Sequence, residues 1–294
     1  MLLTIDIGNT NTVLGVFEGE TLVDSWRIKT DARDTADELA LTYRGLLGDL
    51  DVTGLAACST VPAALGEVRG MLARYYPEVP TVVGEPGVRT GVPLLYDNPR
   101  ELGADRIVNS LAAYTLYGGP AVVVDFGTST NFDVVSARGE FLGGALAPGI
   151  EVSIDALAAR AARLLKVEVA RPRSVIGKST VEAMQSGILY GSAGQIDGLV
   201  RRIVAELGGS ATVVATGGLA PLVIEESETI QRHEPNLTLI GLRLVFARNQ
   251  PAQPAQPAPP THPAPPAHPA HPTRPAEVAP PAQPAPGRTG MVTG

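Results

Sequence analysis

The chain of 294 residues has a single cysteine, Cys58. One cysteine excludes a disulfide framework and a cysteine-based zinc site, and it fits a reduced, cytoplasmic setting. Histidine is also scarce: His233 is the only histidine in residues 1–248. We therefore expect neither a Ser-His-Asp triad nor a histidine-rich metal centre.

Long apolar runs, aromatic residues and excess positive charge are missing as well. No run approaches the roughly 20 apolar residues that span a bilayer, and Asp6 interrupts the first apolar run, so we expect no signal peptide. Aromatic residues make up 4% of the chain, so the core should be aliphatic, which suits an α/β protein. A net charge of −7 argues against nucleic acid or an anionic membrane as the main partner, but not against a small anionic ligand.

Residues 2–12, Leu-Leu-Thr-Ile-Asp-Ile-Gly-Asn-Thr-Asn-Thr, read as a strand that ends in a turn. Asp6 stands beside Gly8 and a run of small polar residues. A carboxylate can hold Mg²⁺, and the backbone N–H groups of such a turn can hold phosphate. The alternative is an ordinary β-turn, in which the same residue types are common.

The same pattern recurs 119 residues later, in residues 121–131. The match aligns Asp6 with Asp125, Gly8 with Gly127, and Thr10 with Ser129. This offset is too long for a solenoid repeat and suits a duplicated domain. The repeat predicts two related half-molecules that face one ligand.

Strands followed by alternating helices and strands predict an α/β fold. Gly118-Gly119-Pro120 marks a boundary, so we expect domains at 1–118 and 119–248. Helices are expected at 152–165 and at 180–207, the second interrupted near 191–194. Residues 249–294 hold more than half of the prolines and should be a disordered tail with polyproline II character. Three histidines of this tail leave metal binding open, beside the simpler reading of a solvated low-complexity segment.

Two further features can bind ligands. Asp105 and Arg106 open a predicted helix, whose N-terminus favours anions, although Asp105 could merely complement the helix dipole. Thr216-Gly217-Gly218 could lie against a flat ligand or serve close packing alone. The Gly177-Lys178-Ser179 run is not a P-loop, because Pro172 stands where glycine is required. Carboxylates, small turns and one helix N-terminus suit phosphoryl transfer.

In this order, the motifs resemble the type III pantothenate kinases of bacterial coenzyme A synthesis. The resemblance covers residues 1 to about 248 and implies two duplicated ribonuclease-H-like (actin-like) domains with ATP in the cleft between them. It rests on the following segments: Asp6–Val13, Ser59–Pro62, Tyr96 with Pro99, Gly103–Arg106, Asp125–Asp133, Gly143–Gly149, Thr180 with Gln185 and Gly187, and Thr216–Gly218.

The resemblance implies a role for each candidate residue. Asp105 would be the general base for the pantothenate hydroxyl, and Asp125 would help to bind a monovalent cation, K⁺ or NH₄⁺. Mg²⁺ would be held through ATP by Asp6. The implied ATP-binding residues are Asp6, Ile7, Gly8, Asn9, Thr10, Asn11, Thr12, Val13 and Thr128. The implied pantothenate-binding residues are Tyr96, Gly103, Ala104, Asp105, Arg106 and Thr180.

A second subunit completes the substrate pocket in this family, so the resemblance also implies a homodimer. The chain departs from the family pattern at Ser129 and Asn131, where the family usually has alanine and threonine. Two alternatives stay open: a related kinase for another small hydroxy acid or sugar, and a non-catalytic nucleotide-binding regulator. Retention of Asp105 disfavours the regulator.

Overall fold

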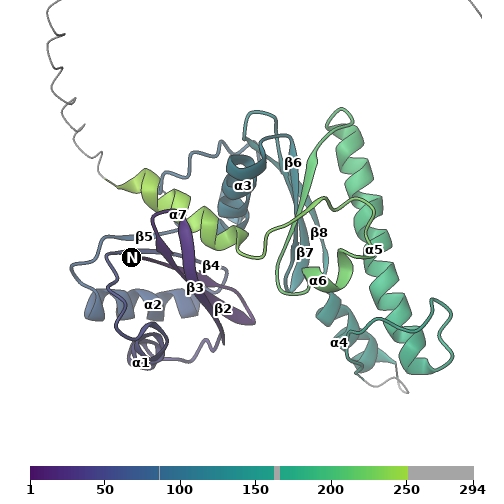
Figure 1. The fold of residues 1–294 in the computed structure, drawn as a ribbon, viewed down its shortest axis with the longest axis horizontal. Helices are drawn as coiled ribbons and strands as arrows, with labels where there is room; N and C mark the ends of the chain where they lie inside the picture. The colour runs from purple at the N-terminus through teal and green to yellow at the C-terminus, as the bar shows by residue number, and fades with distance from the viewer. Residues whose placement is uncertain (86, 162–165, 251–294) are drawn as a thin grey trace, which may run out of the picture. The chain divides into compact units, whose positions relative to one another are not determined.

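The computed structural model describes residues 1–85, 87–161 and 166–250, which contain two five-stranded mixed sheets with helices on both faces of each (Figure 1). The first sheet has the strand order β3-β2-β1-β4-β5, with β1, β2 and β3 antiparallel and β1, β4 and β5 parallel. Its strands are β1 (Leu2–Ile7), β2 (Asn11–Glu18), β3 (Thr21–Lys29), β4 (Gly54–Ser59) and β5 (Thr81–Val83).

The second sheet repeats this plan. In the order β8-β7-β6-β9-β10, its first three strands are antiparallel and its last three parallel, so that β6 occupies the place of β1. The duplicated α/β fold expected from the sequence is thereby confirmed. The strands are β6 (Ala121–Phe126), β7 (Ser129–Val135), β8 (Phe141–Pro148), β9 (Thr212–Thr216) and β10 (Arg232–His233).

Helices α1 and α2 cover one face of the first sheet, α4, α5 and α6 cover one face of the second, and α3 and α7 pack against the other faces of both (Figure 1). The core is aliphatic, as the composition indicates. The helices are α1 (Ala36–Leu47), α2 (Pro62–Tyr75), η1 (Pro99–Glu101), α3 (Ala104–Tyr117), α4 (Ile150–Arg160), α5 (Thr180–Glu206), α6 (Ala220–Val223) and α7 (Leu237–Asn249).

Local sequence signals explain where helices begin. Thr35 and Glu38 form the reciprocal hydrogen bonds of a capping box at the start of α1. Pro62 is the first residue of α2, where its missing N–H has no helical partner to lose. Ser179 caps α5 by accepting a hydrogen bond from the backbone N–H of Glu182, so the rejected P-loop motif is a helix cap.

Helix α5 differs from its prediction, because it runs unbroken through residues 191–194. Leu189, Ala193, Ile196 and Val200 keep one apolar face buried against the second sheet, and this packing outweighs the low helix propensity of the glycines. The expected helix at 152–165 is α4, whose described part ends at Arg160; residues 162–165 lie outside the described ranges.

Helix α7 comes last in the described chain but packs against α3 and the first sheet. A side chain at Gly241 would collide with the backbone oxygen of Val108, so the two helices approach very closely there. Phe246 covers Gly54 of β4. The domain limits at 118 and 248 stay a prediction, and the proline-rich segment falls outside the described residues apart from Asn249 and Gln250.

Candidate active site

Asp6 and Asp125 occupy equivalent places near the ends of the two central strands, β1 and β6. Each stands on a strand that has a parallel neighbour. Asp6 is paired with Cys58 of β4, and Asp125 is paired with Thr216 of β9. Both carboxylates project from the sheet faces that carry α3 and α7. The topology therefore brings together two aspartates that are 119 residues apart in sequence.

Asp6 and Asp125 are both partly buried. Burial raises the pKa of Asp6 to about 7, and the negative charges of Asp105 and Asp125 add to the rise. Burial likewise raises the pKa of Asp125 to about 7, with a contribution from Asp105. Because the negative charge of Asp105 raises the pKa of both Asp6 and Asp125, the site favours a bound cation or protonated carboxyl groups.

Asp105 lies in the first turn of α3, where the helix dipole favours a negative charge. Its Oδ1 atom is buried and has no hydrogen-bond partner among the described residues. Burial raises its pKa, while the backbone N–H and the charge of Arg106 oppose this. A side chain at Gly103 would meet the same oxygen, so the carboxylate folds back over the chain at this glycine and a larger residue there would displace it.

Arg106 pairs with Asp133 of β7 through Nε and Nη2, both 2.6 Å from Oδ1. Asp133 is fully buried, and burial raises its pKa to about 7 although Arg106 acts against the rise. The guanidinium also lies over the Phe141 ring, 5.4 Å from its centroid. Tyr96 packs edge-on against the same ring at 5.8 Å, so Arg106 and Tyr96, both predicted to bind pantothenate, contact one side chain.

The polar turns after β1 and β6 differ in length by one residue. Four residues separate the paired Ile7 and Thr12, whereas three separate Phe126 and Thr130. The alignment of Thr10 with Ser129 is therefore wrong beyond the turn. Instead, Ser129 occupies the place of Asn11, and the backbone oxygens of both accept a hydrogen bond from the glycine N–H at 3.0 Å.

The tips of both turns are exposed. Asn9 and Thr10 reach solvent in the first turn, and Thr128 does so in the second. In contrast, Thr12 is buried and shares a hydrogen bond of 2.9 Å with the hydroxyl of Thr30. The residues predicted to bind ATP thus divide into exposed tips that a ligand can reach and buried positions that hold the turn.

The turn that follows β9 packs tightly against the end of β6. Gly217 has a φ of 91°, and a side chain there would strike the Asp125 carboxylate and the backbone of Phe126. Close packing therefore accounts for Gly217, whereas ligand contact by this turn stays a prediction.

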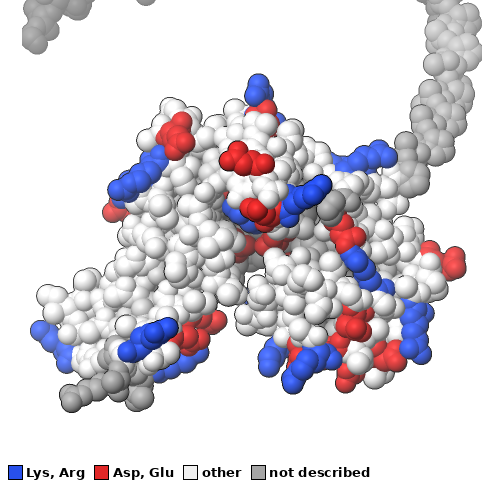
Figure 2. Space-filling view, turned by 180° about the vertical axis from the view of Figure 1, so that it is seen from behind, with Lys and Arg blue, Asp and Glu red and all other residues white. Residues whose placement is uncertain are grey.

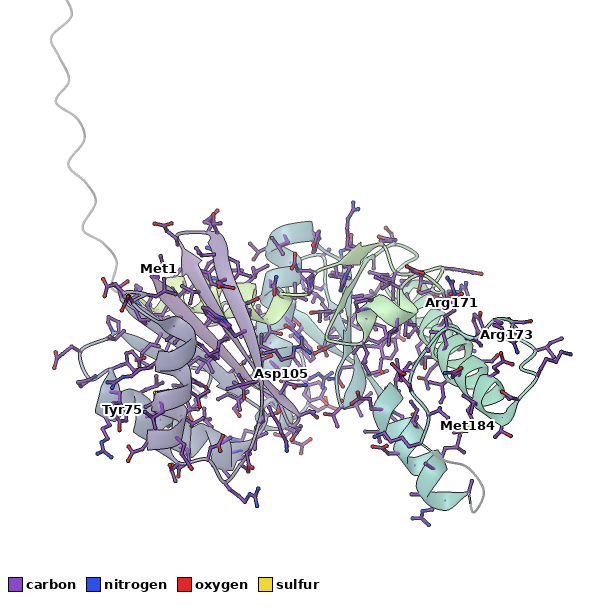
Figure 3. The ribbon with its side chains drawn as sticks, turned by 60° about the horizontal axis from the view of Figure 1, so that its bottom comes forward. Met1, Tyr75, Asp105, Arg171, Arg173 and Met184 are labelled. Carbon is purple, nitrogen blue, oxygen red and sulfur yellow. The ribbon has the colours of Figure 1, made fainter. Side chains whose placement is uncertain are left out.

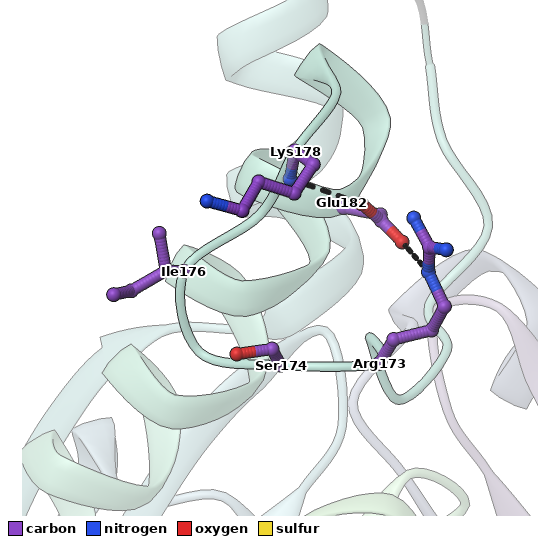
Figure 4. Close-up of a pocket in the computed structure, with 5 residues that line it drawn as sticks. All are labelled: Arg173, Ser174, Ile176, Lys178 and Glu182. Carbon is purple, nitrogen blue, oxygen red and sulfur yellow. Dashed lines mark hydrogen bonds and ion pairs between the residues drawn. The ribbon is translucent and has the colours of Figure 1, made fainter.

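Thr180 begins α5, and no described contact joins it to the other residues predicted to bind pantothenate. Figure 3 shows Asp105 well apart from Met184, which lies one turn into the same helix. The segment before Thr180 and the first turn of α5 form an open cavity of about 320 Å³. It is lined by Arg173, Ser174, Ile176, Lys178 and Glu182 (Figure 4). In the described part of the chain, Thr180 thus lies apart from the other residues predicted to bind pantothenate.

Sequence reasoning gave Asp133 no role, although it is the ion-pair partner of Arg106. A charged residue between Phe132 and Val134 in an otherwise buried strand is the signal that could have found it. Asn109 was also missed; its amide nitrogen donates to Asp125 Oδ2 at 3.4 Å. Its own side-chain oxygen is buried without a partner among the described residues.

Within the described ranges, no group of three or more histidine, cysteine, aspartate or glutamate side chains is placed to hold a metal ion. The aspartates are near enough to affect one another's pKa, but they do not form a complete ligand set. Figure 2 shows acidic and basic side chains interspersed on the face it presents. None of the described helices is long and apolar enough to span a bilayer.

Comparison with known proteins gives one consistent result. The sequence profile of the type III pantothenate kinase family matches residues 2–202. The type III pantothenate kinase of Parafrankia sp. (strain EAN1pec) is 72% identical over 249 residues, covering 85% of this chain and 98% of the relative. The enzyme of the same name from Streptomyces avermitilis is 61% identical over 261 residues, with the same coverage. A solved Baf family protein from Campylobacter jejuni shares the fold, with a TM-score of 0.53, 19% identity, and coverage of 84% of this chain and 98% of that one.

Proposed function

The chain belongs to the type III pantothenate kinase family, and from this premise we propose that it phosphorylates pantothenate with ATP, forming 4'-phosphopantothenate for coenzyme A synthesis. The reaction transfers a phosphoryl group to a hydroxyl. Its chemical needs are a base for the hydroxyl, donors for the phosphates and a counter-charge for the polyphosphate.

The unpartnered carboxylate oxygen of Asp105 is the observation that carries this proposal. A general base must hold a free lone pair toward the substrate and have a pKa that suits proton transfer near neutral pH. Asp105 Oδ1 has no partner among the described residues, and burial raises the pKa of the group. Accepting the proton of the pantothenate hydroxyl is the role these properties fit.

ATP is proposed to bind at the two turns, with its phosphates on the exposed backbone of Asn9, Thr10 and Thr128. The carboxylate of Asp6 would hold Mg²⁺ together with the phosphate oxygens. The incomplete ligand set around Asp6 fits a metal that arrives with the nucleotide, since Mg²⁺ is usually bound through one or two carboxylates plus phosphates and water. The metal supplies positive charge that stabilises the transferring phosphoryl group.

A monovalent cation, K⁺ or NH₄⁺, is proposed to bind at Asp125. The unpartnered side-chain oxygen of Asn109 lies on a residue that donates to this carboxylate, so two oxygen ligands of suitable type are available. The raised pKa of Asp125 expresses the same need for positive charge. A cation here would keep Asp125 ionised at neutral pH.

Pantothenate is proposed to lie against Tyr96, Gly103, Ala104 and Arg106, with its carboxylate on the guanidinium. Asp133 takes Nε and Nη2 of Arg106, but Nη1 makes no hydrogen bond within the described chain and can still bind an anion. Asp133 thus fixes the orientation of the guanidinium and offsets part of its charge.

A homodimer is proposed to bring Thr180 of one subunit to Asp105 of another. The segment around Thr180 exposes apolar side chains, with Val175 64% and Ile176 71% exposed, and Leu146 of β8 is 67% exposed. The adjacent exposed side chains of Val175 and Ile176 support this proposal, because contiguous apolar patches often mark surfaces that another chain covers. We also propose that the protein is cytoplasmic, because this location is consistent with its membership of the family.

The decisive experiment couples ADP formation to a dye assay with ATP, Mg²⁺, K⁺ and pantothenate, beside other hydroxy acids and sugars. Among these acceptors, we expect only pantothenate to be phosphorylated. Asp105→Asn should lose most of this turnover while binding ATP normally, because the amide cannot accept the proton. Turnover with a sugar but not pantothenate, or a near-normal rate for Asp105→Asn, would contradict the proposal.

A further inference from the structure

Arg27 stands in the same lateral row of the first sheet as Asp6. Val13 of β2 lies directly between them, since it is paired with Asp6 on β1 and with Arg27 on β3. Side chains that are directly opposite across a sheet project from the same face. The neighbours Trp26 and Ile28 confirm this direction, because they pack on the other face, against the core under α1 and α2.

The side chain of Arg27 extends from the first sheet to the turn after β9 of the second. A Cβ atom at Gly218 would lie 2.5 Å from Nη1 of Arg27, so the guanidinium lies directly against this glycine and a side chain there would displace it. Arg27 is exposed to solvent as a residue. Its guanidinium therefore lies between the two sheets, where a ligand between them can reach it.

Arg27 forms no ion pair within 4.0 Å in the part of the chain that the structure describes. The other cation of this region, Arg106, is already paired with Asp133. The charge of Arg27 also counteracts the burial and the neighbouring carboxylates that raise the pKa of Asp6. It is thus an uncompensated positive charge near the carboxylate that the proposed function assigns to the Mg²⁺ of ATP.

The equivalent row of the second sheet lacks this charge. Asp125 is paired with Asn131 of β7, and Asn131 with Leu146 of β8, so Leu146 occupies the place of Arg27. The two halves share their central aspartate and differ at the end of the row. The strand architecture alone therefore does not require a cation at the position of Arg27.

We propose that Arg27 binds the phosphate oxygens of the nucleotide, a role that rests on the proposed kinase function and assigns a further residue to its ATP site. The planar guanidinium can donate two parallel hydrogen bonds to a phosphate. Its guanidinium lies against Gly218, in the turn that follows β9 of the second sheet, while its backbone belongs to the first sheet. Arg27 thereby joins both halves of the molecule to one polyphosphate.

The test compares Arg27→Gln, Arg27→Lys and the control Arg74→Gln, which removes an equally charged residue from the surface of α2. ATP dissociation constants are measured by calorimetry without pantothenate, beside melting temperatures without nucleotide. Loss of a charge-assisted hydrogen bond predicts affinity for ATP that is about tenfold weaker or worse in Arg27→Gln. Arg27→Lys should fall between, and Arg74→Gln should match the wild type.

Two results would overturn the assignment. One is ATP affinity within about twofold of wild type in Arg27→Gln. The other is equal weakening in Arg27→Gln and Arg27→Lys together with lower melting temperatures, which would identify Arg27 as a structural contact with Gly218. If the wild-type protein binds ATP but does not phosphorylate pantothenate, the proposed function fails while the measurement on Arg27 still decides its own question.

Discussion

Replacement of Asp125 by asparagine should make the ligand-free protein more stable, by an amount that grows as the pH rises from about 4 to 7. Burial raises the pKa of Asp125 from 3.8 to about 7. Between these two values the folded protein binds a proton that the unfolded chain releases. The stability that protonated Asp125 contributes is therefore fully present below pH 4 and is lost as the pH rises toward 7.

The size of the effect follows from the shift. One pKa unit corresponds to about 1.4 kcal/mol, so a rise of about three units gives an upper value of ~4 kcal/mol at pH 8. Asparagine is neutral at every pH and close to aspartate in shape, and its oxygen can still accept the hydrogen bond from Asn109. The variant should match wild type near pH 4 and exceed its free energy of unfolding by ~2–4 kcal/mol at pH 8.

Urea unfolding at pH 4.5 and pH 8, in buffers free of K⁺, NH₄⁺ and divalent cations, measures the difference. Asp49→Asn is the control, because this exposed aspartate makes no hydrogen bond or ion pair to a described residue. Added K⁺ should stabilise wild type at pH 8 and leave Asp125→Asn unchanged. An equal stability gain for Asp125→Asn at both pH values, or a loss at pH 8, would refute the reasoning.

Three further predictions test other features. Mixing unfolded Asp105→Asn and Thr180→Val chains and refolding them should restore about a quarter of wild-type activity, because in random dimers one site in four regains both native residues; no recovery in dimers that form would place both residues in one chain. Truncation after Gln250 should leave activity intact, whereas Asn249→Ala should raise the KM for pantothenate. The Asn249 side chain makes hydrogen bonds of 2.9 and 3.1 Å with the Arg89 backbone and so holds the segment that leads to Tyr96. An unchanged KM in Asn249→Ala would contradict this. Tyr43→Phe should stabilise the protein by about 1 kcal/mol in thermal unfolding, since the buried Tyr43 hydroxyl has no partner among the described residues; destabilisation would reveal a hidden partner.

Local and repeated signals made much of the fold predictable. The capping box before α1, Pro62 at the start of α2 and the repeated strand-Asp-x-Gly pattern each act over a few residues, so they can be read directly. The repeat also paired Asp6 with Asp125 correctly. It failed beyond the turn because a one-residue difference in turn length cannot be seen until strand register is known.

Long-range contacts set the limit of prediction. The pairing of Arg106 with Asp133 depends on how α3 crosses β7, and the glycines of α5 are held in a helix by packing against a sheet whose strands come both before and after α5 in sequence. The row that connects Asp6 to Arg27 requires the register of three strands. Such relations arise from packing, which a single sequence does not display.

The position of α7 has a consequence for synthesis of the protein. The first sheet is translated early, but Gly54 and Val108 receive their packing partners Phe246 and Gly241 only when α7 is made. At about 5–20 residues per second, the roughly 130 residues from Tyr117 to Asn249 take on the order of ten seconds to translate. During this interval Gly54 and Val108 lack the residues that cover them, so the amino-terminal half cannot complete its packing until α7 has been translated.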